Sequence, residues 1–172
     1  MQVVKRIIGG FFLLILFLWL FAPKQELYYF LEKTLKEQDV IISNETIKDT
    51  WYGVKIQNAD IYVKGAKMAH IGELELNIFF LYNTLIIKEI TTDEVVHKVA
   101  PKSVDEVSVK YSVLDPLRVK LNGLGSFGTM DGNVTLLEKH LLIKFPVSKD
   151  IRAFRKFLKK DETGVWKYET TY

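Results

Sequence analysis

The sequence begins with its longest apolar run, sixteen residues between Arg6 and Pro23 that carry no charged or polar side chain. As an α-helix rising ~1.5 Å per residue, this run would extend ~24 Å, slightly less than the ~30 Å hydrocarbon core of a bilayer. The helix gains a turn if the two preceding cations extend toward the headgroups. We therefore expect residues 1–23 to form a transmembrane helix, with these anchoring residues: Lys5, Arg6, Phe12, Leu16 and Trp19.

A cleaved signal peptide is the alternative interpretation, because the run is short and follows two cations. Cleavage requires small residues before the cut, whereas the run ends in Leu20-Phe21-Ala22-Pro23, which favours an uncleaved anchor. Lys5, Arg6 and the terminal amine favour a cytoplasmic N-terminus, although three lysines just beyond the run weaken this bias. The expected topology is a single-pass protein of the bacterial inner membrane, with residues 24–172 forming one strand-rich periplasmic domain.

The apolar residues after Pro23 recur at every fourth position, which is typical of an amphipathic helix. Leu27, Leu31 and Leu35 form one face, and glutamates and lysines occupy other positions. We expect this helix to pack its leucines against a sheet. Lying flat on lipid is the alternative, but the mixed charge of the helix disfavours it.

From residue 40 onward the apolar period changes from four to two, which predicts antiparallel β-strands. The alternation shifts by one place at Gln57-Asn58, where we expect a bulge or bend. A polar stretch over residues 91–103 separates a first hairpin unit from a second one. Asp150 is expected to cap a basic helix that reaches Lys160, and residues 164–168 are expected to form a closing strand.

The predicted fold class is α+β, mainly antiparallel β, with a transmembrane helix, an amphipathic helix, a curved sheet in two hairpin units and a C-terminal basic helix. One apolar face is expected to serve as core or as a groove, and its residues are Leu74, Leu76, Ile78, Phe80, Val107, Val109 and Tyr111. The basic helix offers a candidate contact face for anionic headgroups or an acidic partner, formed by Arg152, Arg155, Lys156, Lys159 and Lys160. An ordinary solvated helix face is the alternative.

Composition narrows the function classes. The formal net charge is +3, and without Lys5 and Arg6 the rest of the chain carries only +1, which argues against a nucleic-acid partner. The chain has no cysteine, which excludes disulfides, thiolate catalysis and cysteine-ligated metals.

Candidate catalytic motifs are weak. The glycine spacing in Gly123-Leu124-Gly125-Ser126-Phe127-Gly128 matches a dinucleotide fingerprint, but another strand pattern follows it instead of a helix. The three histidines lie in different segments without metal-ligand spacing. We therefore expect no enzyme activity, no cofactor, no metal and no small-molecule substrate. Asn133 is a candidate glycosylation site, because Asp131-Gly132-Asn133-Val134-Thr135 fits the acidic sequon of bacterial periplasmic glycosylation, although turn chemistry also explains these residues.

The order of these segments resembles a known group of envelope proteins. A membrane anchor and an amphipathic helix precede strand patterns over residues 53–63, 69–76 and 85–90, and a glycine series leads into residues 134–136 and 141–143. This order resembles the type II secretion system protein N group and its AsmA-like relatives. The resemblance implies a long, curved antiparallel sheet in the periplasm.

Two functions are consistent with these observations. The first is a non-enzymatic structural or accessory component of a multi-protein envelope machine, such as a secretion system or motor scaffold, which contacts lipids through its anchor and other envelope proteins through its domain. The second is an AsmA-like module that binds or transfers lipid between membranes. The two functions differ in whether the apolar face of the sheet is sealed by the helices or lines an open concavity.

Overall fold

The computed structural model describes residues 24–79 and 81–172, and the side chains of residues 24–27 and 31 lie outside that description. The predicted transmembrane anchor, with Lys5, Arg6, Phe12, Leu16 and Trp19, therefore lies outside the described residues, as does Phe80. Within the described ranges, no helix is long and apolar enough to cross a membrane.

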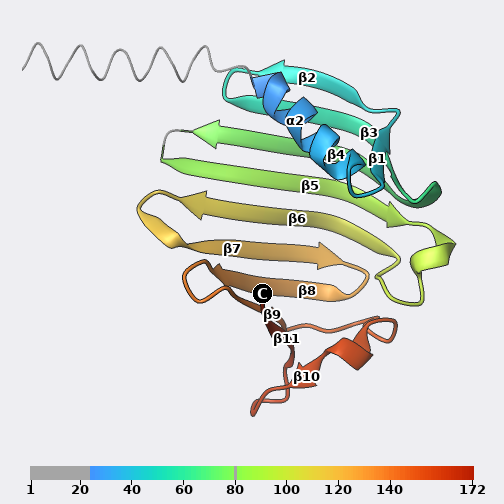
Figure 1. Ribbon diagram of the computed structural model, residues 1–172. Helices are drawn as coiled ribbons and strands as arrows, with labels where there is room; N and C mark the ends of the chain where they lie inside the picture. The colour runs from blue at the N-terminus through green and yellow to red at the C-terminus, as the bar shows by residue number, and fades with distance from the viewer. Residues whose placement is uncertain (1–23, 80) are drawn as a thin grey trace, which may run out of the picture.

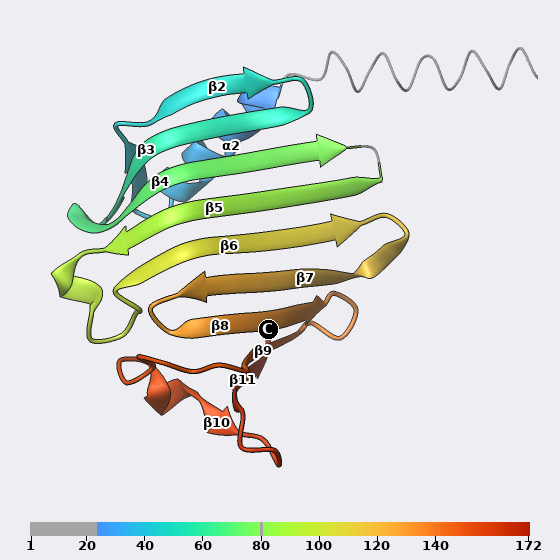
Figure 2. The same cartoon turned by 180° about the vertical axis from the view of Figure 1, so that it is seen from behind.

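One open antiparallel sheet forms the body of the protein (Figures 1 and 2). Its strands run in the spatial order β1-β3-β4-β5-β6-β7-β8-β9-β11-β10, and β2 shares the first edge with β1 by also pairing with β3. The strands are β1 (Val40–Ser43), β2 (Thr46–Thr50), β3 (Gly53–Val63), β4 (Ala66–Phe79), β5 (Tyr82–Thr92), β6 (Ser103–Ser112), β7 (Asp115–Gly125), β8 (Gly128–Thr135), β9 (His140–Phe145), β10 (Lys159–Lys160) and β11 (Trp166–Thr171). This arrangement confirms the expectation of a mainly antiparallel β fold with few helices.

The sheet carries a crease across four strands at one level. The ladder between β3 and β4 pairs Gln57 with Glu73 and Ala59 with Ile71 but omits Asn58 and Gly72. The ladder between β4 and β5 likewise omits the pair of Gly72 and Glu89, and the ladder between β5 and β6 omits the pair of Glu89 and Asp105. At the same level, the pairing of β6 with β7 shifts in register. Asn58 and Glu89 adopt positive φ angles of 58° and 56°, which shift by one residue the alternation of side chains between the two faces of the sheet. The irregularity that the sequence predicts at Gln57-Asn58 is thus part of a line that crosses the sheet.

The expected division into two hairpin units is wrong. Residues 93–102 connect β5 to β6, and these two strands pair directly along most of their length, from Tyr82 opposite Ser112 to Thr91 opposite Ser103. The polar stretch is a connection at the end of the sheet, with a short 3₁₀ helix at Glu94–Val96. A polar stretch in sequence marks a solvated turn as readily as a boundary, and only the pairing distinguishes them.

The expected C-terminal basic helix is also wrong. Residues 150–160 contain only a 3₁₀ turn at Arg155–Phe157, and the backbone is extended by Leu158, so Lys159–Lys160 form strand β10 against β11. Ile151 and Leu158 are buried in a cluster with Val104, Phe127 and Phe145. Their spacing resembles a helical period, but burying them against the strands required a folded-back loop. The closing strand expected at residues 164–168 is present as β11.

The amphipathic helix is present as α2 (Lys24–Lys36) and lies on the sheet beside β1 and β3. Its buried anchor is Tyr28, which packs with Val54, Ile56 and Ala59 of β3. Leu35 is half-buried, and the side chains of Leu27 and Leu31 lie outside the description. Tyr28 lies three residues before Leu31 and seven residues before Leu35, so it is on the same helix face. The regular spacing of the leucines directed the prediction to them instead of to Tyr28.

Replacing the buried tyrosine should release α2 from the sheet. We expect Tyr28→Ala to lower the free energy of unfolding by ~3 kcal/mol, or about 6–12 °C in melting temperature for a chain of this size. The matched control is Tyr29→Ala, because Tyr29 is the next residue and is 52% exposed. Circular dichroism melts of the full chain in detergent measure both, and equal melting temperatures for the two variants would show that α2 does not hold the sheet.

Gly128 should be required where the loop after β9 crosses β8. Its φ angle is +97°, and an added Cβ would meet the carbonyl oxygen of Val147 in that loop. Gly65 also has a positive φ angle, of +80°, but nothing lies within 4 Å of its Cβ position. Both alanine variants suffer backbone strain of ~1–2 kcal/mol. We expect Gly128→Ala to lower the melting temperature clearly more than Gly65→Ala, and a reversed order would contradict this packing.

Candidate functional site

The two faces of the sheet differ sharply in chemistry. Cross-strand register places Leu76, Leu85, Val109 and Leu121 in one row across β4 to β7. A second row on the same face contains Leu74, Ile87, Val107 and Gly123, and continues to Met130 in β8. This is the face on which α2 lies, because Tyr28 contacts Ile56 and Leu74. We call it the concave face.

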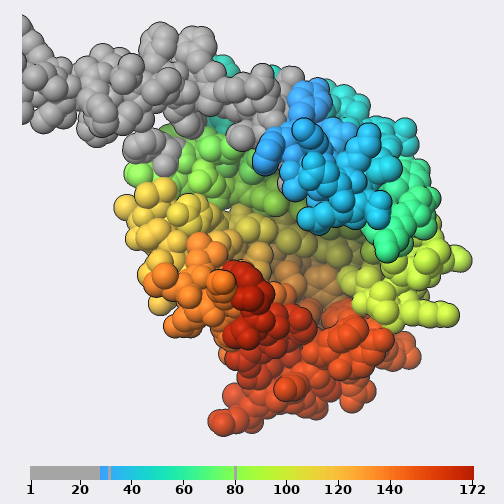
Figure 3. Space-filling view, in the orientation of Figure 1, coloured from blue at the N-terminus to red at the C-terminus, as the bar shows by residue number. Residues whose placement is uncertain are grey.

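The concave face is covered at two places and open between them. Figure 3 looks onto this face: α2, in blue, and the C-terminal segment, in red, stand on either side of a hollow floored by the middle strands. Residues 146–158 cover the far end of β6 to β9, where Phe127, Phe145, Ile151 and Leu158 are buried. Between the two covers, Leu85, Ile87, Val109 and Leu121 are all only half-buried. The described residues therefore leave an apolar strip of the sheet facing a hollow.

A pocket of about 210 Å³ opens from this hollow beneath α2. Its lining is aliphatic except for Tyr28, and it includes Ile71, Leu74, Leu76 and Leu85. The Tyr28 hydroxyl donates a hydrogen bond to Glu45 Oε1 at 3.1 Å. Burial, followed by the hydrogen bond and the charge of Glu45, raises the pKa of Tyr28 above its usual range. The pocket therefore presents hydrocarbon to any occupant, with its one hydroxyl already engaged.

One polar group on the concave face lacks a partner. Asn83, two residues before Leu85 on β5, has a buried side-chain oxygen with no hydrogen-bond partner among the described residues. Its cross-strand neighbour on β6 is Tyr111. A buried amide oxygen without a partner costs free energy.

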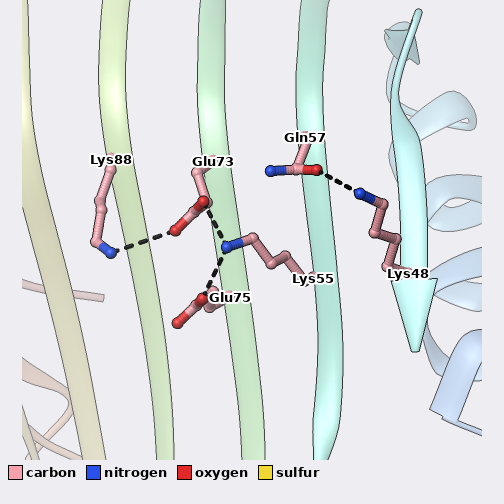
Figure 4. A network of polar contacts seen from close by, with 6 residues as sticks. All are labelled: Lys48, Lys55, Gln57, Glu73, Glu75 and Lys88. Atoms are coloured by element: carbon pink, nitrogen blue, oxygen red, sulfur yellow. Dashed lines mark hydrogen bonds and ion pairs between the residues drawn. The ribbon is translucent and has the colours of Figure 1, made fainter. Parts of the chain in front are cut away.

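The convex face is polar and held by cross-strand ion pairs (Figure 4). Lys55 Nζ lies 2.6 Å from Glu73 Oε2 and 3.2 Å from Glu75 Oε1, and Lys88 Nζ lies 3.2 Å from Glu73 Oε1. The hydrogen bond from Lys55 holds the pKa of Glu73 below its ordinary value, although partial burial opposes this. Exposed pairs contribute little each, but here they bridge three strands and keep this face hydrated.

Asp60 forms a second polar cluster near the edge of the sheet. This buried carboxylate accepts hydrogen bonds from Lys67 Nζ at 2.7 Å and Asn44 Nδ2 at 3.0 Å, and its Oδ1 lies 2.8 Å from His70 Nδ1. Lys67, Asn44 and His70, in that order, hold the pKa of Asp60 well below its usual range. The cluster joins β3, β4 and the turn after β1, so we interpret it as structural.

The structure places the sequence-predicted residues as follows. Leu74, Leu76, Ile78, Val107, Val109 and Tyr111 share the concave face through the β4–β5–β6 register. The basic residues lie on a loop, a 3₁₀ turn and strand β10 instead of one helix. Arg155 and Lys160 lie 4.8 Å and 5.1 Å from the Trp166 ring, and Arg152 lies beside Asp150.

Two further sequence motifs lie in strands. Asn133 is exposed within β8, so the turn interpretation of Asp131-Gly132-Asn133 is wrong, while the glycosylation hypothesis stays a prediction. Gly123 to Gly128 span the β7–β8 hairpin, in which a second strand follows the first, so the context for a dinucleotide fingerprint is lacking. Within residues 24–79 and 81–172, no group of three histidine or carboxylate side chains is arranged to hold a metal.

The Asp60 cluster should make stability depend on pH. Because the native pKa is depressed, the carboxylate stabilises the fold fully above the unfolded pKa of ~3.9, and this contribution is lost as pH falls below that value. We expect Asp60→Asn to lower the melting temperature at pH 7 and to approach the parent protein as pH falls from 4 toward 2. The control is Asp105→Asn, at an exposed position of β6. A gap between Asp60→Asn and the parent that stays constant over this pH range would contradict the role given to the carboxylate.

Comparison of the chain with models of protein families, with curated proteins and with solved structures found no match. The resemblance to the type II secretion system protein N group and AsmA-like proteins therefore stays a prediction.

Proposed function

We propose that this protein is a non-enzymatic lipid-binding module that accommodates acyl chains on the concave face of its sheet. Residues 1–23 would anchor it in the bacterial inner membrane, with residues 24–172 in the periplasm. The proposal takes up the second of the two functions that the sequence suggests. It also replaces the expectation that no small molecule is bound, because a lipid is the ligand proposed here.

The observation that carries the proposal is the half-buried apolar strip between the two covers. Leu85, Val109 and Leu121 come from three neighbouring strands and belong to neither of the two buried clusters that the described residues form. Leaving such a strip in water is unfavourable, and each methylene group buried against it contributes ~0.8 kcal/mol. An acyl chain therefore fits the strip better than a polar ligand.

The size and polarity of the hollow support an amphiphilic ligand. The pocket beneath α2 measures about 210 Å³, below the ~300–1,000 Å³ typical of pockets that enclose a whole ligand. A chain that enters it must therefore continue along the open strip. Asn83 and Tyr111, which are cross-strand neighbours in β5 and β6, provide polar groups on the same face beside the strip. An apolar floor with polar groups at one end suits an amphiphilic ligand whose acyl chain lies in the pocket and along the strip.

Site-specific photo-crosslinking tests the proposal directly. We expect a benzophenone amino acid at Leu85, on the concave face, to form lipid adducts in native membranes that mass spectrometry can identify. Ile86 is the matched control, because it is the next residue of β5, is also half-buried and aliphatic, and faces the convex side opposite Glu75 and Ser108. Both variants must retain the melting temperature of the parent chain.

The outcome is decided by the ratio of the two adduct yields. We expect a yield at least ~10-fold higher at position 85 than at position 86. Similar yields at both positions, or no adduct at either, would remove the support for a lipid-binding face. Leu85→Gln should reduce lipid that copurifies with the chain, whereas Ile86→Gln should leave it unchanged.

A structural role in an envelope assembly is the second candidate. The observation that favours it is the pair of sheet edges, since β2 and β10 each pair with one strand only among the described residues. Edge strands offer backbone groups for pairing with another protein. Cross-linking in cells that express the protein natively should recover defined envelope partners, and recovery of the chain alone would count against this role.

A further inference from the structure

Four turns lie side by side at one end of the sheet. Successive strands are antiparallel, so the turns β2–β3, β4–β5, β6–β7 and β8–β9 all fall at the same end (Figures 1 and 2). Backbone hydrogen bonds of 2.7–3.0 Å connect each turn to the strand or turn beside it, from Ile78 to Tyr52, from Val113 to Leu81, from Leu136 to Leu117 and from Tyr172 to Lys139. The turns therefore form a continuous row, which we call the apolar rim.

The rim concentrates exposed hydrophobic side chains. Trp51 in the first turn is 83% exposed, Leu114 in the third is 82% exposed and Leu137 in the fourth is 74% exposed. Tyr52 and Tyr82 are also exposed there. More than half of the exposed large hydrophobic residues in the described ranges lie on this rim, so their exposure is not a random scatter over the surface.

The opposite end of the sheet is different. Lys64 lies in its turn between β3 and β4, Lys67 lies at the start of β4, and Asp93, Glu94 and Lys98 lie between β5 and β6. The exposed aliphatic side chains described there, such as Val95, Val99 and Leu124, lie on separate elements. The molecule thus has one apolar end and one charged end.

The chain enters the domain at the apolar end. Helix α2 begins with Lys24 next to the β2–β3 turn (Figures 1 and 2). In the sequence, the sixteen-residue apolar run ends at Ala22, two residues earlier. If this run is in lipid, as the proposed function holds, the rim lies near the same lipid.

The composition of the rim suits a bilayer surface. Tryptophan and tyrosine prefer the interface between headgroups and hydrocarbon, and leucine prefers the layer beneath. Charges near the rim alternate in sign, as in Asp115 with Arg118 and Glu138 with Lys139. The rim therefore has no electrostatic preference for anionic over zwitterionic headgroups. Neighbouring turns on the rim are two strands apart, which separates them by ~9–10 Å. A bilayer surface accepts all of these turns at once, whereas a protein partner needs a matching cavity for each turn.

We propose that the apolar rim inserts into the surface of the bilayer, so that the sheet stands on the membrane with its charged end directed away. The inference does not depend on lipid binding by the concave face. The rim turns are contact points of the protein with a membrane, and the partner is the phospholipid surface itself.

Spin labels on single cysteines test this inference in the full chain, which has no native cysteine. Leu114→Cys and Leu137→Cys label the rim, and Val95→Cys labels an exposed aliphatic position at the opposite end. The labelled chains are reconstituted into phosphatidylcholine vesicles. All three carry the same N-terminal run, so tethering is equal, and circular dichroism verifies that each variant folds.

Power saturation compares label access to oxygen, which partitions into lipid, with access to a water-soluble nickel complex. We expect the oxygen-to-nickel ratio to be at least ~3-fold higher at positions 114 and 137 than at position 95. Equal ratios at both ends, or failure of the chain to associate with vesicles, would overturn the proposal. Dipolar broadening at position 114 with a low ratio would overturn it in favour of rim-to-rim pairing of two copies. An absence of lipid adducts at Leu85 would leave the rim result unaffected.

Discussion

The structure is governed by the need to cover one apolar face of a single large sheet. Most domains cover such a face with a complete second layer. Here the second layer consists of α2 at one edge and residues 146–158 at a corner of the other, each centred on a small buried cluster. The middle of the face has no such cover among the described residues, and the binding proposal depends on this imbalance between a wide sheet and two narrow covers.

The convex face shows why the sheet holds together without a full second layer. Its strands are long and pair along most of their length, and Lys55, Glu73 and Lys88 join neighbouring strands across that face. Asp60 fixes the edge through three side-chain partners. Backbone pairing and these polar contacts set the register, while the apolar face supplies burial only at its ends. Such a sheet is stable as a surface on which a ligand or membrane can complete the burial.

Much of the fold is predictable because alternation is a local signal. The period of two in β4 to β6 and the period of four in α2 are readable in single segments, as is the phase change at Asn58. Residues 150–160 are not, because Ile151, Phe154 and Leu158 satisfy a helical spacing while their burial against β6 to β9 requires a loop. The rim also cannot be predicted from the sequence. Trp51, Leu114 and Leu137 are far apart in the chain, and only the order of strands brings their turns into one row.

The crease through Asn58, Gly72, Glu89 and Asp105 has a mechanical consequence. Along this line the ladders omit their pairs in four neighbouring strands, so resistance to bending across the strands is lowest there. Gly72 lets the Glu89 side chain lie close against the backbone at the same level, where any larger residue would wedge the two strands apart. Helix α2 spans this line, because the cluster around Tyr28 contains Val54 and Ile56 on one side of Asn58 and Ala59 on the other, so the helix braces the sheet where its ladders are interrupted.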